Sequence, residues 1–415
     1  MKIQKSFPAI LIYFVSAIFS FAQTWTQIGT SISNWDLTAM SADGTKLIAT
    51  TLTQNTGAGI GVFPGDANYY SVSAIYASTN SGDTWTQIPQ ITNWTSIASS
   101  ADGTKLVVGA GGIYFSTNSG MTWSQSDAPI NSWHSIASSS DGNKLIAGAY
   151  GGLIYLSTDA GNTWLPTGVP MTNSLGYSNY WLSVASSAEG NVLAAVAGNW
   201  EPGAIYVSTN SGTTWLETSA PITNWWTVAM SANGSEIIAG VGYGLIYIST
   251  NFGAAWTATS APTSGWQSAA VSADGSKIAA ACLPVNLPPP DEISPGSIYT
   301  STNFGVDWVS NNVPFAAWLD VASSADGNKL FAINHGGEMW MSQITPSPSI
   351  SATQTNGRLT LSWLAPSTNF HLQQSSDLQN WSAAANQPIL NLTNLQEQVA
   401  LPLNGGANFF RLTTQ

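Results

Sequence analysis

The sequence predicts an all-β protein: a seven-bladed β-propeller followed by a small C-terminal β-sandwich. Three observations lead to this prediction. A four-stranded unit recurs seven times, and two tight turns recur at fixed places within it. The fourth strand that the seventh copy lacks stands instead near the N-terminus. Repeated sheets that close into a ring leave only short edges, which is the arrangement of a propeller.

The repeating unit is clearest at residues 94–123. It has a first strand, an Asp-Gly hairpin, a second and a third strand, and a Ser-Thr-Asn-Ser-Gly-x-x-Trp turn that begins a fourth strand. These parts fall at residues 94–100, 102–103, 105–110, 113–116 and 116–123. Asp-Gly predicts a tight hairpin, because Gly tolerates a positive φ and Asp bonds to its own backbone. One such sheet cannot bury both of its faces, so the copies must pack on one another.

Each copy opens on a tryptophan and continues into the hairpin. The opening tryptophans are Trp35, Trp94, Trp133, Trp181, Trp225, Trp266 and Trp318. The hairpin acids or amides are Asp43, Asp102, Asp141, Glu189, Asn233, Asp274 and Asp326. The second turn occurs six times and is missing after residues 336–342. Residues 24–28 supply the missing strand, so we expect the N-terminal strand to complete the last blade and close the ring.

The second turn resembles the Asp-box, or BNR repeat, Ser-x-Asp-x-Gly-x-x-Trp. Its central residue is an acid once and an amide five times: Asp159, Asn80, Asn118, Asn210, Asn251 and Asn303. Either side chain can accept hydrogen bonds from the backbone amides that follow. The resemblance covers about residues 23–345. It implies a propeller like those of sialidases, xyloglucanase-type glycosidases, sortilin-type receptors and photosystem II assembly factors. Because these proteins differ in function, the resemblance implies a fold and no single activity.

Residues 1–22 have the features of a secretory signal peptide. Lys2 and Lys5 precede an apolar stretch at residues 8–21, and Ser20-Phe21-Ala22 fits a cleavage site. The apolar stretch is too short for a membrane span. We therefore expect a protein that is secreted, either extracellular or at the cell surface.

Composition excludes several classes of function. Charged residues make up 7% of the chain and the formal net charge is −12, so nucleic acid, which requires clustered Lys and Arg, is not an expected partner. The single cysteine, Cys282, has no partner for an internal disulfide. The histidines have no metal-ligand spacing, and Asp291-Glu292 lacks the frame of a calcium loop. We expect a monomer with no cofactor and no metal.

The long insertions all fall on the propeller face opposite the two recurring turns. They lie at residues 51–73, 166–180, 198–203 and 283–295, and they carry Tyr69, Tyr70, Tyr177, Tyr180, Trp200 and Glu201. Insertions confined to one face of a repeat array indicate the binding face. We take these six residues as candidate ligand contacts.

The seven opening tryptophans are predicted to lie near the central mouth on the same face. They serve either as packing between blades or as flat platforms for sugar rings or for a partner's side chains. The next residue differs from copy to copy: Asp36, Thr95, His134, Leu182, Trp226, Gln267 and Leu319. Specificity could be encoded at this position, and Trp226 joins the tryptophans as a candidate contact.

Our first functional hypothesis is a non-catalytic propeller that binds a polysaccharide or an extracellular protein. Sialidase activity is disfavoured, because its mechanism holds the substrate carboxylate with three arginines, whereas the only arginines here are Arg358 and Arg411, beyond the propeller. A third hypothesis is an extracellular scaffold that assembles with other proteins and binds no small ligand.

The second hypothesis is a glycoside hydrolase or lyase on neutral or uronic polysaccharide. It needs two carboxylates roughly 5–9.5 Å apart. The candidates are Asp36, Asp320, Glu201 and Glu338. Asp320 stands where five other copies have Ser or Thr, but it is one register away from Asp36, so the two side chains could point to opposite sides of their strands.

Residues 346–349, with Pro346 and Pro348, are predicted to form a short stiff linker. Residues 350–415 then predict a small sandwich with strands at residues 350–355, 358–363, 370–374, 398–403 and 409–414. The run at 375–381 and the ending at 409–412 resemble fibronectin-III-like accessory modules of secreted bacterial proteins.

Overall fold

The computed structural model shows an all-β chain, with strands and no helix among the residues that it describes. These are residues 25–28, 32, 34–51, 74–88, 94–198, 201–286, 293–294, 296–343, 350–355, 358–364, 370–376, 379–384, 388–391, 396–402 and 409–414. The chain divides into two compact units, Gln23–Ile344 and Thr345–Asn391 with Leu395–Gln415. The predicted signal peptide and linker lie outside the described residues.

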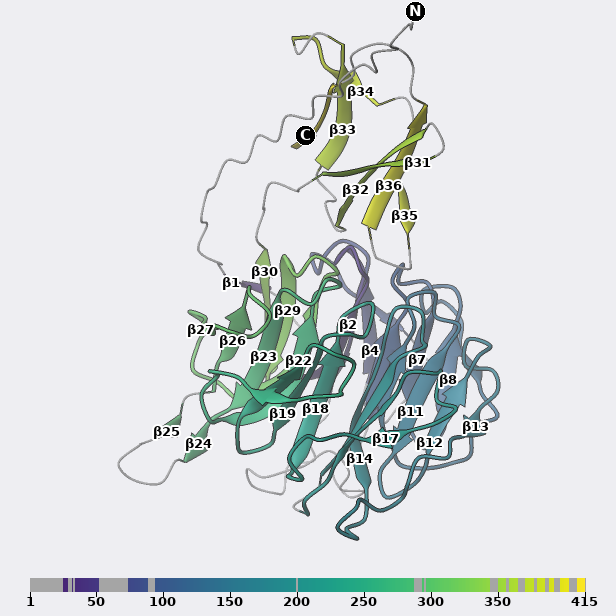
Figure 1. Ribbon diagram of the computed structural model, residues 1–415, viewed down its shortest axis with the longest axis vertical. Coiled ribbons are helices and arrows are strands. Elements are labelled where there is room, and N and C mark those ends of the chain that lie inside the picture. Colours follow the sequence, from purple (N-terminus) through teal and green to yellow (C-terminus); the bar gives the residue numbers. More distant parts are fainter. Residues whose placement is uncertain are drawn as a thin grey trace, which may run out of the picture. The chain divides into compact units, whose positions relative to one another are not determined.

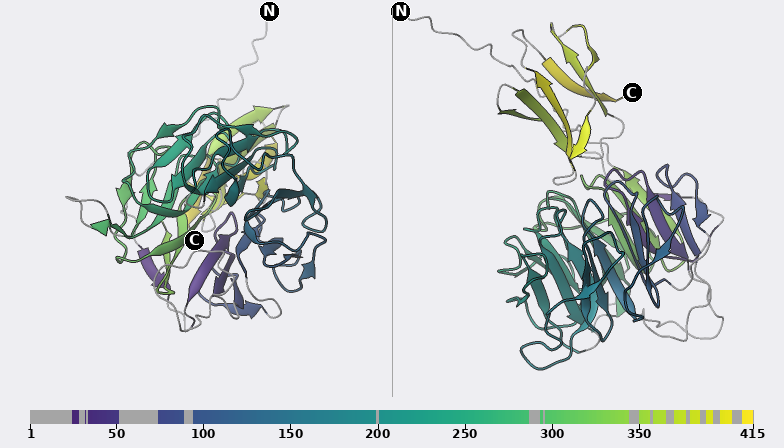
Figure 2. Two further views of the ribbon diagram at one scale, coloured as in Figure 1. Left: turned by 90° about the horizontal axis from the view of Figure 1, so that it is seen from below. Right: turned by 90° about the vertical axis from the view of Figure 1, so that its right-hand side faces the viewer.

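The first unit consists of seven four-stranded antiparallel sheets around a common axis (Figures 1 and 2). Blade 1 is formed by β2 (Trp35–Met40), β3 (Leu47–Thr51), β4 (Ala74–Ser78) and β5 (Thr86–Ile88). Blade 2 is formed by β6 (Ser96–Ser99), β7 (Leu106–Gly109), β8 (Ile113–Ser116) and β9 (Ser124–Gln125). Blade 3 is formed by β10 (Trp133–Ser138), β11 (Leu145–Ala149), β12 (Ile154–Ser157) and β13 (Leu165–Pro166).

Three further blades follow in chain order. Blade 4 is formed by β14 (Tyr180–Ser186), β15 (Leu193–Gly198), β16 (Ile205–Ser208) and β17 (Leu216–Glu217). Blade 5 is formed by β18 (Trp225–Met230), β19 (Ile237–Val241), β20 (Ile246–Ser249) and β21 (Thr257–Ala258). Blade 6 is formed by β22 (Gly265–Val271), β23 (Ile278–Leu283), β26 (Ile298–Ser301) and β27 (Val309–Ser310), and its insertion holds β24 (Val285–Asn286) and β25 (Ile293–Ser294).

Blade 7 joins the two ends of the propeller. It is formed by β28 (Trp318–Ser323), β29 (Lys329–Asn334), β30 (Met339–Gln343) and, from the N-terminus, β1 (Trp25–Ile28). β1 pairs antiparallel with β30, with Trp25 opposite Ser342 and Ile28 opposite Met339. This confirms the prediction that the N-terminal strand completes the seventh blade.

The ring is closed by backbone hydrogen bonds between successive hairpins on the side of the Asp-Gly turns. Each hairpin donates one backbone N–H to a carbonyl oxygen of the next, at 2.6–2.9 Å. The residues in this circle are Ala42, Ala101, Ser140, Ala188, Ala232, Ala273 and Ala325, and Ala325 donates back to Ala42. The first strands of adjacent blades are also in contact around the whole ring, including β28 with β2.

The lysines of the hairpins reinforce this circle. Lys46 Nζ donates to the carbonyl oxygen of Asp102 in the next blade at 2.7 Å. Lys105, Lys144 and Lys277 do the same for the blades that follow them. The lysine stems also cover the glycine of the neighbouring hairpin. These cations therefore hold blades together on the face opposite the insertions.

The second recurring turn has the predicted internal bonding. Asn118 Oδ1 accepts a hydrogen bond from the backbone N–H of Thr122 at 2.9 Å, and Ser116 Oγ accepts one from Gly120 at 2.9 Å. The indole N–H of Trp123 donates to the Gly120 carbonyl at 3.0 Å. In the other five copies the glycine N–H likewise donates to the serine hydroxyl oxygen.

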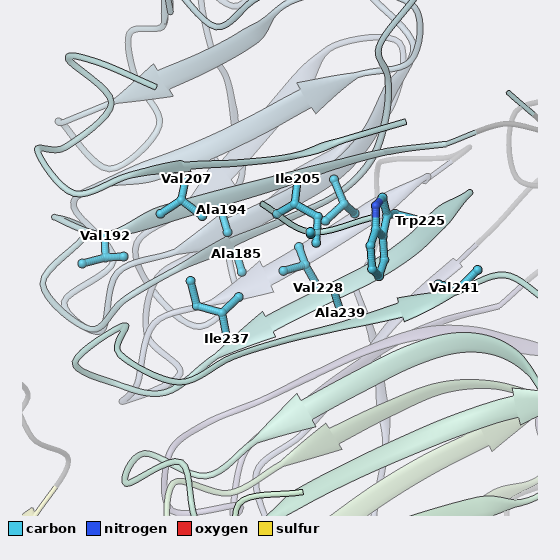
Figure 3. Close-up of a cluster of buried hydrophobic side chains, with 12 residues drawn as sticks. Ala185, Val192, Ala194, Ile205, Val207, Trp225, Val228, Ile237, Ala239 and Val241 are labelled. Carbon is cyan, nitrogen blue, oxygen red and sulfur yellow. The ribbon is translucent and has the colours of Figure 1, made fainter. Parts of the chain in front are cut away.

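The cores lie between blades. Figure 3 shows one of them, where Ala194, Ile205 and Val207 of blade 4 face Val228, Ile237 and Trp225 of blade 5. Each opening tryptophan packs against aromatic rings of its own blade. In blade 3, for example, the Trp133 ring lies 5.3 Å from Tyr155, edge to face, and 6.4 Å from Trp164. Large aromatic residues therefore supply much of the packing between neighbouring sheets.

The second unit has two sheets that enclose a core of its own. One sheet has the strand order β31 (Ser351–Thr355), β32 (Arg358–Leu364), β36 (Gln396–Pro402) and β35 (Ile389–Asn391). The other has the order β34 (Ser382–Ala383), β33 (Phe370–Ser375) and β37 (Phe409–Thr414). Leu361, Trp363, Leu372, Val399 and Phe410 are buried between them. This is the small β-sandwich that the sequence predicts.

We expect Gly142→Ala to destabilise the propeller more than Gly176→Ala. Both glycines have a left-handed backbone, with φ of 69° and 86°, so an alanine at either site is strained by about 1 kcal/mol. A Cβ on Gly142 would also lie 2.8 Å from Lys105 Cβ and 2.9 Å from Ser100 Cβ, whereas one on Gly176 has open space. Urea unfolding should show a free energy of unfolding lower for Gly142→Ala by about 1 kcal/mol or more. Equal losses would contradict this account of the contact between blades.

Candidate binding surface

The seven opening tryptophans do not offer open ring faces. Their side chains are only 0–4% exposed: Trp35, Trp94, Trp133, Trp181, Trp225, Trp266 and Trp318. A sugar ring or a partner's side chain must reach the face of an indole in order to stack on it, so the platform interpretation is wrong for these residues. Their large area is buried between blades, which is the packing alternative.

The residue that follows each opening tryptophan is partly exposed instead. In six blades the pairing of the first and second strands shifts at this point, as in blade 3, where Trp133 pairs with Ala149 and Ser135 with Gly148. His134 falls between these two pairs, and its Nδ1 lies 2.9 Å from the Leu182 carbonyl oxygen of the next blade. A β-bulge of this kind redirects side chains. Asp36, Thr95, His134, Leu182, Trp226, Gln267 and Leu319 are all partly exposed.

The six candidate contact residues of the insertions differ in exposure. Tyr69, Tyr70 and Trp200 lie outside the described residues. Glu201 is exposed, Tyr177 is 42% exposed, and Tyr180 is partly exposed.

Aromatic rings cluster at blades 3 to 5 on the face that carries the insertions. The His134 ring stacks on Tyr150 with centroids 5.9 Å apart, and Tyr150 lies 5.3 Å from Tyr180. In blade 5, Trp226 lies 6.4 Å from Tyr243, which is half exposed. Sequence reasoning missed Tyr150 and Tyr243. Both stand in glycine-containing turns between the second and third strands. An aromatic residue in such a turn was the sequence signal that could have identified them.

The predicted insertion at residues 166–180 begins at the end of β13, and its residues 167–180 are hydrogen-bonded to blade 4. Asn173 Oδ1 accepts hydrogen bonds from the backbone N–H groups of Leu175 and Tyr177, and its Nδ2 donates to the Pro202 carbonyl. The Glu217 carboxylate accepts bonds from the backbone N–H and the hydroxyl of Ser174. The bonds to Asn173 Oδ1 therefore stabilise the turn within the insertion, and the bonds to Pro202 and Glu217 attach the insertion to blade 4.

Tyr206 completes this attachment. Its hydroxyl donates to Glu217 Oε2 at 2.8 Å. Burial raises the pKa of Tyr206 to about 12. Burial alone would raise the pKa of Glu217 as well, but the bonds from Ser174 and Tyr206 outweigh it and lower that pKa. Glu217 is thus ionised and bonded at neutral pH.

The attached insertion presents apolar side chains to solvent. Met171, Leu175 and Tyr177 are 39%, 66% and 42% exposed. We call these residues, with the stack of His134, Tyr150 and Tyr180, the aromatic ledge. A preformed surface loses little conformational entropy when a partner binds. The arrangement therefore suits binding by contact and stacking.

Two of the candidate carboxyl groups, those of Asp36 and Asp320, have raised pKa values. Burial, and then the charge of Asp320, raises the pKa of Asp36 to about 7. Burial raises the pKa of Asp320 to about 6, although hydrogen bonds from Ser268, Thr38 and Val321 oppose this. The two acids lie on neighbouring strands in contact, and Thr38, two residues after Asp36, donates its backbone N–H to Asp320. Simple strand alternation suggested instead that their side chains could point to opposite sides. The bulge after Trp35 breaks that alternation.

Both oxygens of Asp320 already have protein donors. Oδ2 accepts the backbone N–H of Thr38 at 2.7 Å, while Oδ1 accepts the Ser268 hydroxyl at 2.6 Å and the Val321 N–H at 3.0 Å. Serines at the same register in other blades also accept an N–H from the next blade: Ser96, Ser135, Ser183 and Ser268. Asp320 therefore belongs to the contacts between blades. Glu338, in blade 7, bonds to Asn334 and Trp340.

In the part of the chain that the structure describes, no three His, Cys, Asp or Glu side chains come together as metal ligands. Over the same residues, no helix is long and apolar enough to cross a membrane.

Solved β-propellers resemble this chain in fold. Ycf48 bound to a D1 peptide has 13% sequence identity and a TM-score of 0.53, with 80% of this chain and 99% of that one covered. Ycf48 from Cyanidioschyzon merolae has 12% identity and a TM-score of 0.55, with 77% and 98% covered. The GH74 xyloglucanase from Xanthomonas campestris has 15% identity and a TM-score of 0.55, with 82% of this chain and 59% of that one covered.

No protein-family model matches the sequence, and no curated protein matches it. At such low identities the structural likeness shows the fold alone. The chain is thus a seven-bladed β-propeller with a small β-sandwich, while its Asp-box and fibronectin-III-like resemblances remain predictions.

We expect Glu217→Ala to release the insertion at residues 167–180. Limited proteolysis should cut this segment several-fold faster, because Ser174 loses its acceptor, while the propeller stays folded. The exposed Glu201→Ala is the matched control. Since the pKa of Glu217 is lowered in the fold, its stabilising contribution is present at neutral pH. It should be lost only as the pH falls below the ordinary value of 4.5. Unchanged cleavage in Glu217→Ala would refute the assigned role.

Proposed function

We propose that this protein is a secreted, non-catalytic binding propeller that recognises a glycan or a protein through the aromatic ledge. The observation that carries the proposal is the insertion at residues 167–180, which is bonded to blade 4 and yet exposes Met171, Leu175 and Tyr177. Exposed aromatic and apolar side chains on a preformed surface are typical of binding sites. Secretion rests on the signal-peptide features of residues 1–22.

Charge supports the same proposal. The five propeller lysines all belong to the hairpins on the opposite face, where four donate to backbone carbonyls and Lys329 donates to Ser81. A ligand that needs recognition by lysine or arginine, such as a sialic acid, a phosphate or a nucleic acid, therefore has neither of these residues at the ledge. Neutral sugars and apolar protein segments do not need such groups.

The neighbours in fold are consistent with both kinds of partner. One solved Ycf48 is bound to a D1 peptide, and a GH74 xyloglucanase shares the propeller architecture. Proteins of this fold thus hold peptides or act on glycans, and the ledge could serve either purpose. A glycan array and pull-downs with extracellular proteins distinguish a glycan partner from a protein partner.

Glycoside hydrolysis or lysis is the second candidate. The raised pKa values of Asp36 and Asp320, about 7 and about 6, favour it, because a carboxylic acid protonated near neutral pH can act as a general acid. The three protein donors on Asp320 oppose it. A polysaccharide panel scored for reducing ends separates the two. Product release that is lost in Asp36→Asn would establish the enzyme and overturn the non-catalytic proposal.

We expect Tyr177→Ala and Leu175→Ala to weaken partner binding by about tenfold each, since a buried aromatic or leucine anchor is worth about 1–2 kcal/mol. The mature protein would be screened on a glycan array and in pull-downs with extracellular proteins. Met121→Ala is the matched control, because Met121 is 79% exposed on the opposite face. Binding that survives both ledge substitutions, or deletion of the four insertions, would refute this assignment of the surface.

A further inference from the structure

The junction between blades 7 and 1 differs chemically from the other junctions of the ring. At the other junctions where this bond is seen, a serine hydroxyl accepts the backbone N–H of the next blade, as Ser135 does from Val184 at 3.0 Å. Between blades 7 and 1 the acceptor is the Asp320 carboxylate, at 2.7 Å from the N–H of Thr38. Through Ser268 the same carboxylate also contacts blade 6. One ionisable group thus joins three blades where the chain closes.

A second acid stands beside it. Asp36 follows Trp35 on the first strand of blade 1, two residues before Thr38, whose backbone N–H donates to Asp320. The charge of Asp320 contributes to the raised pKa of Asp36. Among the described residues no cation lowers the pKa of either carboxyl. The titratable groups on the strands packed around them point elsewhere. Lys329 of β29 donates to Ser81, and its charged neighbours are Asp43 and Asp326.

Two more titratable groups lie on the neighbouring elements. Cys282 of β23 bonds to Ser297, and Glu338, after β29, accepts bonds from Asn334 and Trp340. His335 lies in the same turn as Glu338 and is exposed. For both aspartates burial is the first cause of the raised pKa, and the charge of Asp320 adds to it at Asp36.

We propose that Asp36 and Asp320 form a pH-sensitive latch at the junction of blades 7 and 1, closed while the pair retains a proton and loosened when both carboxyls are ionised. With one proton present, Asp320 keeps its bonds to Thr38 and Ser268 beside a neutral Asp36. With none, both carboxyls are negatively charged, and no cation of the described residues lowers the pKa of either. Like charges at short range in a partly dry site repel strongly.

The direction of the effect follows from the raised pKa values. An acid whose pKa is higher in the closed than in the open state favours closure at low pH and disfavours it as the pH rises. With Asp36 at about 7 and Asp320 at about 6, loosening should develop from the ordinary value of 3.8 upward and be complete above about 7. β1 is the outermost strand of blade 7, and its Ile28 packs against the core between blades 7 and 1.

The test is amide hydrogen exchange of the mature full-length protein at pH 5 and pH 8, corrected for intrinsic rates. Peptides that cover β1, β2 and β28 should open about tenfold more readily or beyond at pH 8, since each pH unit below the folded pKa changes the equilibrium up to tenfold. Peptides from β10 and β14, whose junction uses Ser135, are the internal control.

Two variants make the outcome decisive. Asp36→Asn keeps the shape of the side chain but removes its charge, so the difference between pH 5 and pH 8 should shrink at the junction of blades 7 and 1. Asp320→Ser copies the other junctions and should make this one insensitive to pH. If Asp320→Ser fails to fold, Asp36→Asn alone decides. The same pH difference in Asp36→Asn as in the natural protein, or equal changes in β10 and β14, would overturn the proposal.

Discussion

The propeller depends on a closed circle of seven backbone hydrogen bonds between its hairpins. Each hairpin donates to the next, and Ala325 of the last blade donates to Ala42 of the first. One such bond contributes about 1 kcal/mol net, but each forms only when its neighbours are in place. Positive-φ glycines such as Gly142 let each hairpin approach a side chain of the blade before it, which is a lysine stem in five blades and Val192 or Glu236 in the other two. The ring closes through local geometry that is repeated seven times.

This architecture uses most of the chain's special residues. The opening tryptophans fill the space between blades, the hairpin lysines bond to neighbouring carbonyls, and the Asn residues of the second turn satisfy its backbone. The insertion-bearing face is free of these demands. It can therefore vary from blade to blade without loss of the ring, as the residues after the opening tryptophans do.

The aromatic ledge and the Asp36–Asp320 pair show two uses of such freedom. The ledge combines exposed apolar side chains with firm attachment through Glu217 and Asn173, so its shape is present before a partner arrives. The acid pair lies at the one junction where the two ends of the propeller meet, and it places a titratable contact where other junctions have a hydroxyl. The proposed binding surface therefore lies on blades 3 and 4, whereas the acid pair lies on blades 7 and 1.

The sequence by itself determined the number of blades, the two turns and the closing role of residues 24–28, because these follow from short-range patterns that repeat. It also predicted the small sandwich from alternating strands. Only the tertiary structure decided that Trp133 and its equivalents are buried while His134 is partly exposed, because a β-bulge breaks the alternation of side chains. It alone brought Tyr150 to Tyr180 and Asp36 to Asp320. Contacts between blades join residues far apart in the chain, and local pattern carries no information about such distances.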